Sequence, residues 1–241
     1  MADYYYFIIE GYEQPFGYIR KSKVEQIVWP DYWKTNHDDK LITLNSGSGI
    51  EDRNGYLDKT LRQIHEKGEV SEPRKLFDEP YGIQGPDGKA VLIMNRSAAG
   101  MFGIRTYGVF LIAYIQTDGV RKFWVAQRSQ KKMTYPGKLD MCVAGSHRAQ
   151  EAPIASLREA YTRKWAHSCG AVTYQMSVYD SGKPASRAQT QYAYEIELPT
   201  DMAPKPCDGE VEEFKLMTLE EVRDSLFQRD FKLNIAMTWM D

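Results

Sequence analysis

The apolar positions in the N-terminal part of the chain alternate between strand-like runs and helical periods. The run YYYFII at residues 4–9 predicts a buried strand, and the charged segment at residues 21–29 predicts a short helix. Residues 56–68 place leucine and isoleucine at helical spacing and end in glycine, which predicts an amphipathic helix. After a polar stretch that contains proline, the run AVLIMNR at residues 90–96 predicts a further strand. These elements predict a small α+β domain at residues 1–95.

The C-terminal part is denser in strand patterns. Residues 106–116 and 121–129 flank the tight turn TDGV, which is typical of a β-hairpin. Residues 170–179 and 189–198 flank a longer loop and predict a second hairpin. Strands with helices between them favour a mixed sheet covered by helices.

Two short signals predict the helices of this part. Pro153 fits the first turn of a helix that follows a glycine turn. Thr218 and Glu221 stand at capping-box spacing at the start of an amphipathic segment at residues 218–227. The expected fold class is therefore α/β, or α+β, with a second domain at residues 96–241.

Composition and charge exclude several classes of protein. The net charge of −2 gives no electrostatic basis for binding nucleic acid or an anionic membrane. The N-terminus lacks the basic and apolar regions of a secretion signal, and no stretch approaches the roughly 20 apolar residues of a transmembrane helix. The three scattered cysteines, Cys142, Cys169 and Cys207, favour a reducing compartment over a disulfide framework or a zinc site. We therefore expect a cytoplasmic protein without nucleic-acid or membrane partners, and its oligomeric state stays open.

A series of motifs in the C-terminal part resembles the Nudix hydrolases. The motifs are GVFLIAYI, RKFWVAQRSQKKMTYPGKLDMCVAGS and, further on, REA. The segments FGIRTYGV, TYPGKLD and DGEVEEFKLMTLEEV are similar to those of the subgroup related to thiamine pyrophosphokinase, which carries an extra N-terminal domain. The resemblance covers nearly the whole chain. It implies a Nudix α/β/α sandwich with a mixed sheet at residues 96–241 and an ancestral, Mg²⁺-dependent activity on diphosphate-linked substrates.

The segment that matches the Nudix signature is incomplete. The signature consists of Gly, five residues, Glu, seven residues, Arg-Glu, an apolar residue, one more residue and a Glu-Glu pair. Gly145 and Glu151 match this pattern, and the Arg-Glu pair follows one residue early. Thr162 and Arg163 then stand where a metal site needs further carboxylates. We interpret the difference as a deletion.

The missing carboxylates bear directly on metal binding. Mg²⁺ prefers near-octahedral oxygen ligands, and carboxylates three or four residues apart on a helix converge on one ion. Glu159 alone does not hold the ion, and Arg163 adds a repelling charge. We therefore expect no metal and no cofactor, and Mg²⁺ only if Glu210, Glu212 or Glu213 supplies a ligand from a loop. The alternative for this acidic run is a solvated surface.

The first strand of the predicted sheet differs from the subgroup in polarity. The subgroup tends to have the pattern GVHxNGY, whereas this chain reads GVFLIAY, so Phe110 and Ile112 replace polar groups on one strand face. If this face lines the pocket, the pocket suits a hydrophobic small-molecule substrate better than a pyrophosphate. The alternative is that both side chains belong to the sheet core.

Four side chains are candidates for proton transfer: His147, Glu159, Asp140 and Glu213. His147 follows the glycine turn, and histidine titrates near neutral pH. Glu159 would serve as a general base in an apolar pocket, and Asp140 would orient His147 or act itself. The alternatives are an exposed loop histidine, a salt bridge between Glu159 and Arg163, and a turn or capping role for Asp140.

Other side chains are candidates for ligand contact. Beyond Phe110 and Ile112, they are Lys131, Tyr135, Met141, Tyr174 and Gln191. The first two lie with Lys132 in a loop that is expected to close over a ligand, unless the loop is simply solvated. Core packing is the alternative for Met141. The last two lie on facing strands of the second predicted hairpin.

Three functions are compatible with these features. The first is a metal-independent enzyme that performs acid/base chemistry (isomerisation, dehydration or cyclisation) on a hydrophobic small molecule, in a setting such as specialised metabolism. The second is a residual Mg²⁺-dependent diphosphatase acting on thiamine-diphosphate-like or nucleoside-diphosphate-linked substrates. The third is a non-catalytic ligand-binding module. New acid/base groups in the pocket would favour the first function, and retained acids in the loop would favour the second. The absence of both would favour the third.

Overall fold

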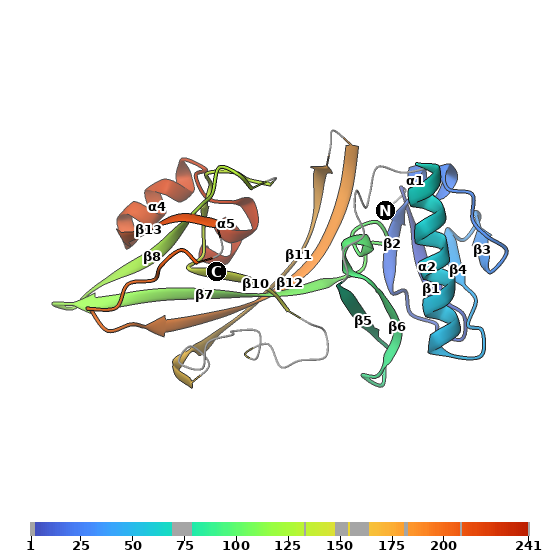
Figure 1. The fold of residues 1–241 in the computed structure, drawn as a ribbon, viewed down its shortest axis with the longest axis horizontal. Coiled ribbons are helices and arrows are strands. Elements are labelled where there is room, and N and C mark those ends of the chain that lie inside the picture. Colours follow the sequence, from blue (N-terminus) through green and yellow to red (C-terminus); the bar gives the residue numbers. More distant parts are fainter. Residues whose placement is uncertain are drawn as a thin grey trace. The chain divides into compact units, whose positions relative to one another are not determined.

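The chain folds into two compact units, which are shown in Figure 1. The computed structural model describes residues 3–68, 79–132, 134–147, 154, 164–180, 183–207 and 209–240. The first unit contains the described residues up to Thr106 together with Tyr174–Gln189. The second contains Tyr107–His147, residues 154 and 164–173, and the chain from Thr190 onward. The domain division predicted at residues 95 and 96 stays a prediction.

The first unit is built on a four-stranded sheet in the order β2-β1-β4-β3. Its strands are β1 (Tyr4–Ile9), β2 (Gly17–Arg20), β3 (Trp33–Asn36) and β4 (Leu41–Leu44). β1 is antiparallel to β2 and parallel to β4, so the sheet is mixed. Burial alternates along β1, where Tyr5, Phe7 and Ile9 point into the core. The strand predicted at residues 4–9 is therefore confirmed.

Helices and a hairpin complete the first unit. They are α1 (Lys21–Gln26), α2 (Ile50–Lys67), β5 (Pro80–Gln84), β6 (Ala90–Asn95) and the 3-10 turn η1 (Arg96–Ala98). α2 buries Leu57, Leu61 and Ile64 on one face. It ends at Gly68, whose φ of 61° is the left-handed conformation that glycine adopts without strain. The amphipathic helix is thus confirmed, and it begins at Ile50 rather than at residue 56.

Two glycines allow the chain after β6 to pack closely on β2. A Cβ atom on Gly17 would lie 2.2 Å from the carbonyl oxygen of Phe102. A Cβ atom on Gly103 would lie 2.1 Å from the carbonyl oxygen of Tyr18, and Gly103 also has a positive φ of 59°. Backbone meets backbone at this point, so only glycine fits at either position.

A seven-stranded sheet, most of which belongs to the second unit, has the order β11-β12-β7-β8-β13, in which β10 pairs with β7 and β9 pairs with β8. The strands are β7 (Thr106–Thr117), β8 (Val120–Arg128), β9 (Leu139–Asp140), β10 (Val143–His147), β11 (His167–Asp180), β12 (Lys183–Glu197) and β13 (Val211–Thr218). Asp118 and Gly119 join β7 to β8 with φ values of 52° and 79°. Two positive φ angles are typical of a type I′ turn, which matches the right-handed twist of paired strands. The first predicted hairpin is confirmed.

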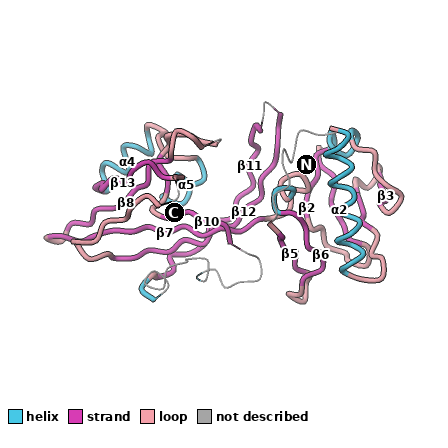
Figure 2. The backbone as a smooth tube through the Cα atoms, in the orientation of Figure 1, coloured by secondary structure: helices cyan, strands magenta, loops and turns pink. Residues whose placement is uncertain are grey.

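The sheet of the second unit carries one hydrophobic cluster on each face, because successive side chains of β7 point to opposite sides. Phe110 belongs to a cluster with Val222 of α4 (Leu219–Phe227) and Ile235 of α5 (Leu233–Trp239). Val109 belongs to the cluster on the other face, and Ile154 packs against it. Helices α4 and α5, cyan in Figure 2, therefore cover one face, and Ile154 packs on the other.

The helix predicted at residues 218–227 is confirmed as α4, and so is its cap. The Oγ1 atom of Thr218 accepts a hydrogen bond from the Glu221 N–H at 3.2 Å, and the Glu221 carboxylate accepts one from the Thr218 N–H at 2.7 Å. The fold class is mixed α+β, as predicted. Among the described residues, none of the helices combines the length and the apolar composition that a bilayer crossing requires.

Candidate functional site

The strand β10 leads into the incomplete signature and is anchored on β7. Gly145 pairs with Val109 and His147 pairs with Tyr107 in an antiparallel register. This pairing holds the glycine of the signature on the central strand of the sheet. The structure describes the backbone of His147 but not its side chain, and Glu151, Glu159 and their neighbours up to residue 163 lie outside the described residues apart from Ile154. The predicted roles of His147 and Glu159 stay predictions.

Gln191 is the predicted ligand-binding residue that lies beside this glycine. It is 4% exposed and comes from β12, the neighbour of β7 on its other side. A Cβ atom on Gly108 would lie 2.2 Å from the Gln191 Oε1 atom and 2.9 Å from the Gly145 carbonyl oxygen. The Gln191 amide therefore occupies the space that a side chain at residue 108 would take. The structure brings Gln191 to the start of the signature, and its contact with a ligand stays a prediction.

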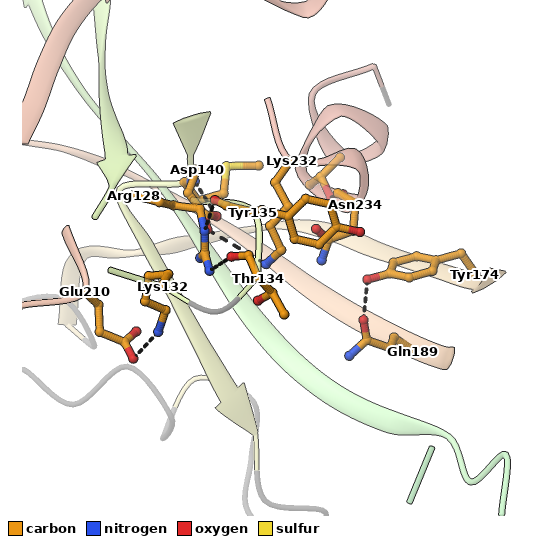
Figure 3. Close-up of polar contacts among 12 residues, drawn as sticks. Arg128, Lys132, Thr134, Tyr135, Asp140, Tyr174, Gln189, Glu210, Lys232 and Asn234 are labelled. Carbon is orange, nitrogen blue, oxygen red and sulfur yellow. Dashed lines mark hydrogen bonds and ion pairs between the residues drawn. The ribbon is translucent and has the colours of Figure 1, made fainter. Parts of the chain in front are cut away.

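Tyr174, the other residue predicted on the second hairpin, belongs to the first unit. Its hydroxyl donates to the Gln189 Oε1 atom at 2.8 Å (Figure 3), and the Gln189 Nε2 atom donates to the Thr106 Oγ1 atom at 3.2 Å. Tyr174 is buried. This chain of hydrogen bonds orients the phenol ring, and it includes Gln189, which the sequence analysis did not single out.

Asp140 lies at the centre of a buried ionic cluster. Its Oδ2 atom lies 2.8 Å from Arg128 Nη1 and 3.8 Å from Lys232 Nζ, and its Oδ1 atom accepts the Met141 N–H at 2.9 Å. The side chains of Asp140 and Arg128 are only 5% and 12% exposed. Both carboxylate oxygens are thus engaged by groups of the protein. The contacts are those of an anchor for the chain at β9, and they do not test the predicted role of Asp140 in proton transfer.

Arg128 connects this cluster to the loop between β8 and β9, as Figure 3 shows. Its Nε atom donates to the Tyr135 carbonyl at 3.0 Å, and its Nη2 atom donates to the Thr134 carbonyl at 2.8 Å. Tyr135 has a φ of 52°, which is strained for a residue with a side chain. One planar guanidinium with several fixed donors is suited to hold such a loop. Arg128 therefore fixes the position of Tyr135, a predicted ligand-binding residue.

The lysines of the loop differ in their surroundings. Lys132 forms an ion pair with Glu210, and the Ser129 N–H donates to the Glu210 carbonyl at 2.9 Å. Lys131 is exposed. The loop is therefore attached to the start of β13 on one side and to Arg128 on the other. Closure of this loop over a ligand stays a prediction.

The acidic run at the start of β13 faces solvent. Glu213 is exposed and its Oε1 atom lies 3.4 Å from Lys215 Nζ. Glu210 is engaged with Lys132. Within the ranges that the structure describes, no three histidine, cysteine, aspartate or glutamate side chains are grouped as a metal site would need. Neither a catalytic role of Glu213 nor a metal ligand in this run is tested by these contacts.

Phe110, Ile112 and Met141 pack into the hydrophobic cluster beneath α4 and α5. Phe110 is 3% exposed and Met141 is 2% exposed, and Ile112 packs against the same cluster. The packing agrees with the alternative of a sheet core, in which large apolar side chains fill the space between sheet and helices. Their contact with a ligand stays a prediction.

Arg128, Lys232 and Gln189 are the polar residues that the sequence analysis missed. A weak signal exists for Arg128, because it ends the strand β8 just before a loop that contains Pro136 and Gly137. No comparable signal exists for Lys232, which reaches Asp140 from a segment 92 residues further along the chain (232 minus 140). Contacts of this kind depend on the tertiary fold alone.

The comparisons with known proteins agree with the resemblance described above. A family model described as a domain of unknown function (DUF4743) matches residues 2–106. Nudix hydrolase 20, chloroplastic, of Arabidopsis thaliana is 30% identical over 269 residues, covering 100% of this chain and 67% of that protein. Nudix hydrolase 24, chloroplastic, of the same plant is 27% identical, covering 96% and 64%.

Further matches include a yeast relative and a solved structure. An uncharacterized protein of Saccharomyces cerevisiae is 30% identical over 211 residues, covering 80% of this chain and 61% of that protein. The chain thus spans 61% to 67% of the length of these relatives. The crystal structure of DR0079 from Deinococcus radiodurans is 15% identical with a TM-score of 0.48, covering 67% of this chain and 98% of that one.

Proposed function

Because the chain belongs to the Nudix hydrolase family, we propose that it is a Nudix-fold enzyme. In this proposal it no longer performs Mg²⁺-dependent diphosphate hydrolysis. Instead, it performs metal-independent acid/base chemistry on a small hydrophobic molecule. The observation that carries the proposal is the signature segment, in which Thr162 and Arg163 stand where the family has paired glutamates. An isomerisation, dehydration or cyclisation needs a positioned proton donor or acceptor and no metal. A place in specialised metabolism and in the cytoplasm belongs to the same proposal, although two plant relatives carry the word chloroplastic in their names.

Two of the four candidates for proton transfer have partners within the protein, which supports proposing the other two. Asp140 is held by Arg128 and Lys232, and Glu213 lies on an exposed strand beside Lys215. A carboxylate whose oxygens already accept from fixed donors is a poor partner for a substrate proton. We therefore assign proton transfer to His147 or Glu159, which flank the glycine turn in the sequence.

The first experiment asks whether a metal is needed. Thiamine diphosphate, nucleoside diphosphates and nucleoside diphosphate sugars are incubated with the full chain, with Mg²⁺ or with a chelator, and phosphate-containing products are quantified. We expect no turnover that depends on Mg²⁺. Turnover that appears with Mg²⁺ and disappears with the chelator would establish the residual hydrolase instead.

The second experiment identifies the proton-transfer group. It first requires a substrate, which is found by screening metabolite extracts for products of unchanged mass or products that have lost water. His147→Ala or Glu159→Gln should lower kcat about 10² to 10⁴-fold. His147→Ala should also remove any inflection of the rate between about pH 5 and 8, where histidine titrates. His65→Ala, at an exposed position near the end of α2, is the matched control. If both variants keep full turnover, proton transfer lies elsewhere.

The hydrophobic preference is tested at the strand that motivates it. Phe110→His with Ile112→Asn places the subgroup's polar pattern back on β7. The double variant should lose affinity for the apolar substrate by about tenfold or more, since a polar group replaces an apolar contact. Circular dichroism and a thermal melt separate this loss from unfolding of the core, in which Phe110 is buried. Unchanged affinity in a folded variant shows that this face does not meet the ligand.

A further inference from the structure

A cleft of about 450 Å³ lies in the second unit between the loop that follows β8, the strand β13 and the end of α4. The residues that line it are Gln127, Gln130, Pro136, Gly137, Lys138, Leu139, Lys215, Met217, Ser225 and Asp230. Its size is within the range of sites for small molecules, which is about 300 to 1,000 Å³. None of the predicted site residues lines it.

The cleft lies on the face of the sheet that α4 and α5 cover. Lys215 pairs with Val125 and Met217 pairs with Phe123, and directly opposed residues of antiparallel strands share a face. Val125 belongs to the cluster that includes residues of α4 and α5, whereas Ile154 of the signature segment packs on the opposite face. The cleft therefore lies on the face of Phe110 and opposite to Ile154, and the anion binding proposed for it is tested independently of the acid/base chemistry proposed above.

The walls of the cleft are fixed by backbone hydrogen bonds. The Leu139 N–H donates to the Asp230 carbonyl at 3.0 Å, and the Lys232 N–H donates to the Leu139 carbonyl at 3.0 Å. On the other side, the Arg128 N–H donates to the Lys138 carbonyl at 3.0 Å. The loop before β9 is thus held between β8 and the connection from α4 to α5. A preformed site avoids the ordering cost that a flexible loop would add to binding.

A glycine shapes one wall. Gly137 has a φ of 69°, and a Cβ atom there would lie 2.4 Å from the Gln130 Nε2 atom. The Gln130 amide therefore rests on the bare backbone of Gly137. Gln127 approaches the same residue, with its Nε2 atom 3.4 Å from the Gly137 carbonyl oxygen. Two side-chain amides thus line the cleft, and each amide carries both donors and an acceptor.

The charged side chains determine what kind of molecule fits. Two ammonium groups, of Lys138 and Lys215, line the cleft together with one carboxylate, of Asp230. Lys138 uses one donor on the Arg229 carbonyl at 2.7 Å, and an ammonium has three donors. Lys215 is exposed, and its Nζ atom lies 3.4 Å from the Glu213 Oε1 atom. We propose that this cleft binds a small polar molecule with a carboxylate or phosphate group, which the lysines meet while the two amides orient its uncharged part.

The test uses the full chain labelled with ¹⁵N, with inorganic phosphate, citrate and glucose as probes. The side-chain amide signals of Gln127 and Gln130 should shift and saturate with phosphate or citrate and not with glucose. The stronger of the two anions identifies a phosphate or a carboxylate as the preferred group. Lys215→Met should weaken binding about tenfold or more, because a charge-assisted hydrogen bond is lost. Lys205→Met, at an exposed position between β12 and β13, should leave binding unchanged.

A second variant blocks the cleft without removing a charge. Ser225→Tyr on α4 places a ring in the space that a ligand would occupy and should abolish the shifts in a chain that melts as the wild type does. The proposal is overturned if neither anion gives a saturable shift up to about 10 mM, which corresponds to a binding free energy too small for a specific site. It is also overturned if Lys215→Met and Ser225→Tyr bind the anions as tightly as the wild type.

Discussion

The loop that ends at Asp140 and the signature segment that follows β10 differ in how acidic and basic side chains are combined. In the loop region, the one buried acid is paired with Arg128 and Lys232. In the signature segment, the sequence has Arg163 where the family has a glutamate. Carboxylates that accept from cations of the protein have fewer oxygens left for a metal ion. A carboxylate that is paired with a cation of the protein is therefore not available as a metal ligand.

The largest effect is expected from breaking the buried pair. Arg128→Met leaves the buried Asp140 with Lys232, at 3.8 Å, as its remaining cationic partner among the described residues, and it releases the Thr134 and Tyr135 carbonyls. Removing one partner of a buried pair costs about 3 to 5 kcal/mol, because an uncompensated charge remains. Urea unfolding followed by tryptophan fluorescence measures the free energy of unfolding.

A double variant separates the cost of the unpaired Asp140 charge from the cost of the lost hydrogen bonds to the loop. Arg128→Met with Asp140→Leu removes both charges and should recover about 1 kcal/mol or more of the loss, since no isolated carboxylate is left. Arg128→Lys keeps a charge but not the planar donors, so it should recover less. Equal stability of Arg128→Met and the wild type would contradict the anchoring role of Arg128.

The next largest effect is expected from placing glutamates back in the signature segment, which should restore metal binding. Thr162→Glu with Arg163→Glu restores the local Arg-Glu, apolar, any-residue, Glu-Glu pattern. The double variant should gain about 2 to 4 °C in Tm at about 10 mM Mg²⁺, whereas the wild type should not respond. Thr162→Gln with Arg163→Gln is the control, because it removes the repelling charge without adding a ligand. A wild-type chain that responds as strongly as the double variant would contradict the loss of the metal site.

Local signals in the sequence predicted the elements that depend on local physics. The Asp118–Gly119 turn, the Thr218 cap and the helical spacing that ends at Gly68 each involve residues within a few positions of one another. Strands β10 and β13 and helix α5 had no such signal, because their short apolar patterns do not distinguish a buried strand from a loop or a helix.

The candidate site was harder to predict than the fold. The carboxylate of Asp140 meets Arg128 and Lys232 across 12 and 92 positions of the sequence (140 minus 128 and 232 minus 140). No spacing rule relates residues so far apart, since the fold alone brings them together. The family pattern predicted the place of Gly145 and identified Thr162 and Arg163 in place of the glutamates, because a signature is a local motif. It did not reveal which acids the fold would pair with cations.

A smaller effect is expected where a loop acid is paired at the surface. Lys132 and Glu210 form an ion pair whose side chains are 26% and 58% exposed. Exposed pairs contribute about 0.2 to 1 kcal/mol and weaken as salt rises. Lys132→Met should therefore lower the free energy of unfolding by no more than about 1 kcal/mol at low salt and by less at about 1 M salt. Lys131→Met, at the neighbouring exposed position, serves as the control, and a larger loss there would show that the pair with Glu210 is not the cause.

The smallest effect concerns an acid that is held mainly by hydrogen bonds. The Thr218 backbone N–H, and then the Thr218 side chain, hold the pKa of Glu221 below its ordinary value of 4.5. A carboxyl group with a lowered pKa in the folded state stabilises the fold above the unfolded pKa, and this contribution is lost as the pH falls through the folded pKa. Glu221→Gln should therefore be less stable than the wild type at about pH 6, and the difference should shrink as the pH is lowered below about 4. Glu220→Gln, in the same first turn of α4, should show no comparable dependence. A difference between Glu221→Gln and the wild type that stays constant across this range would mean that the charge of Glu221 makes no contribution to the cap.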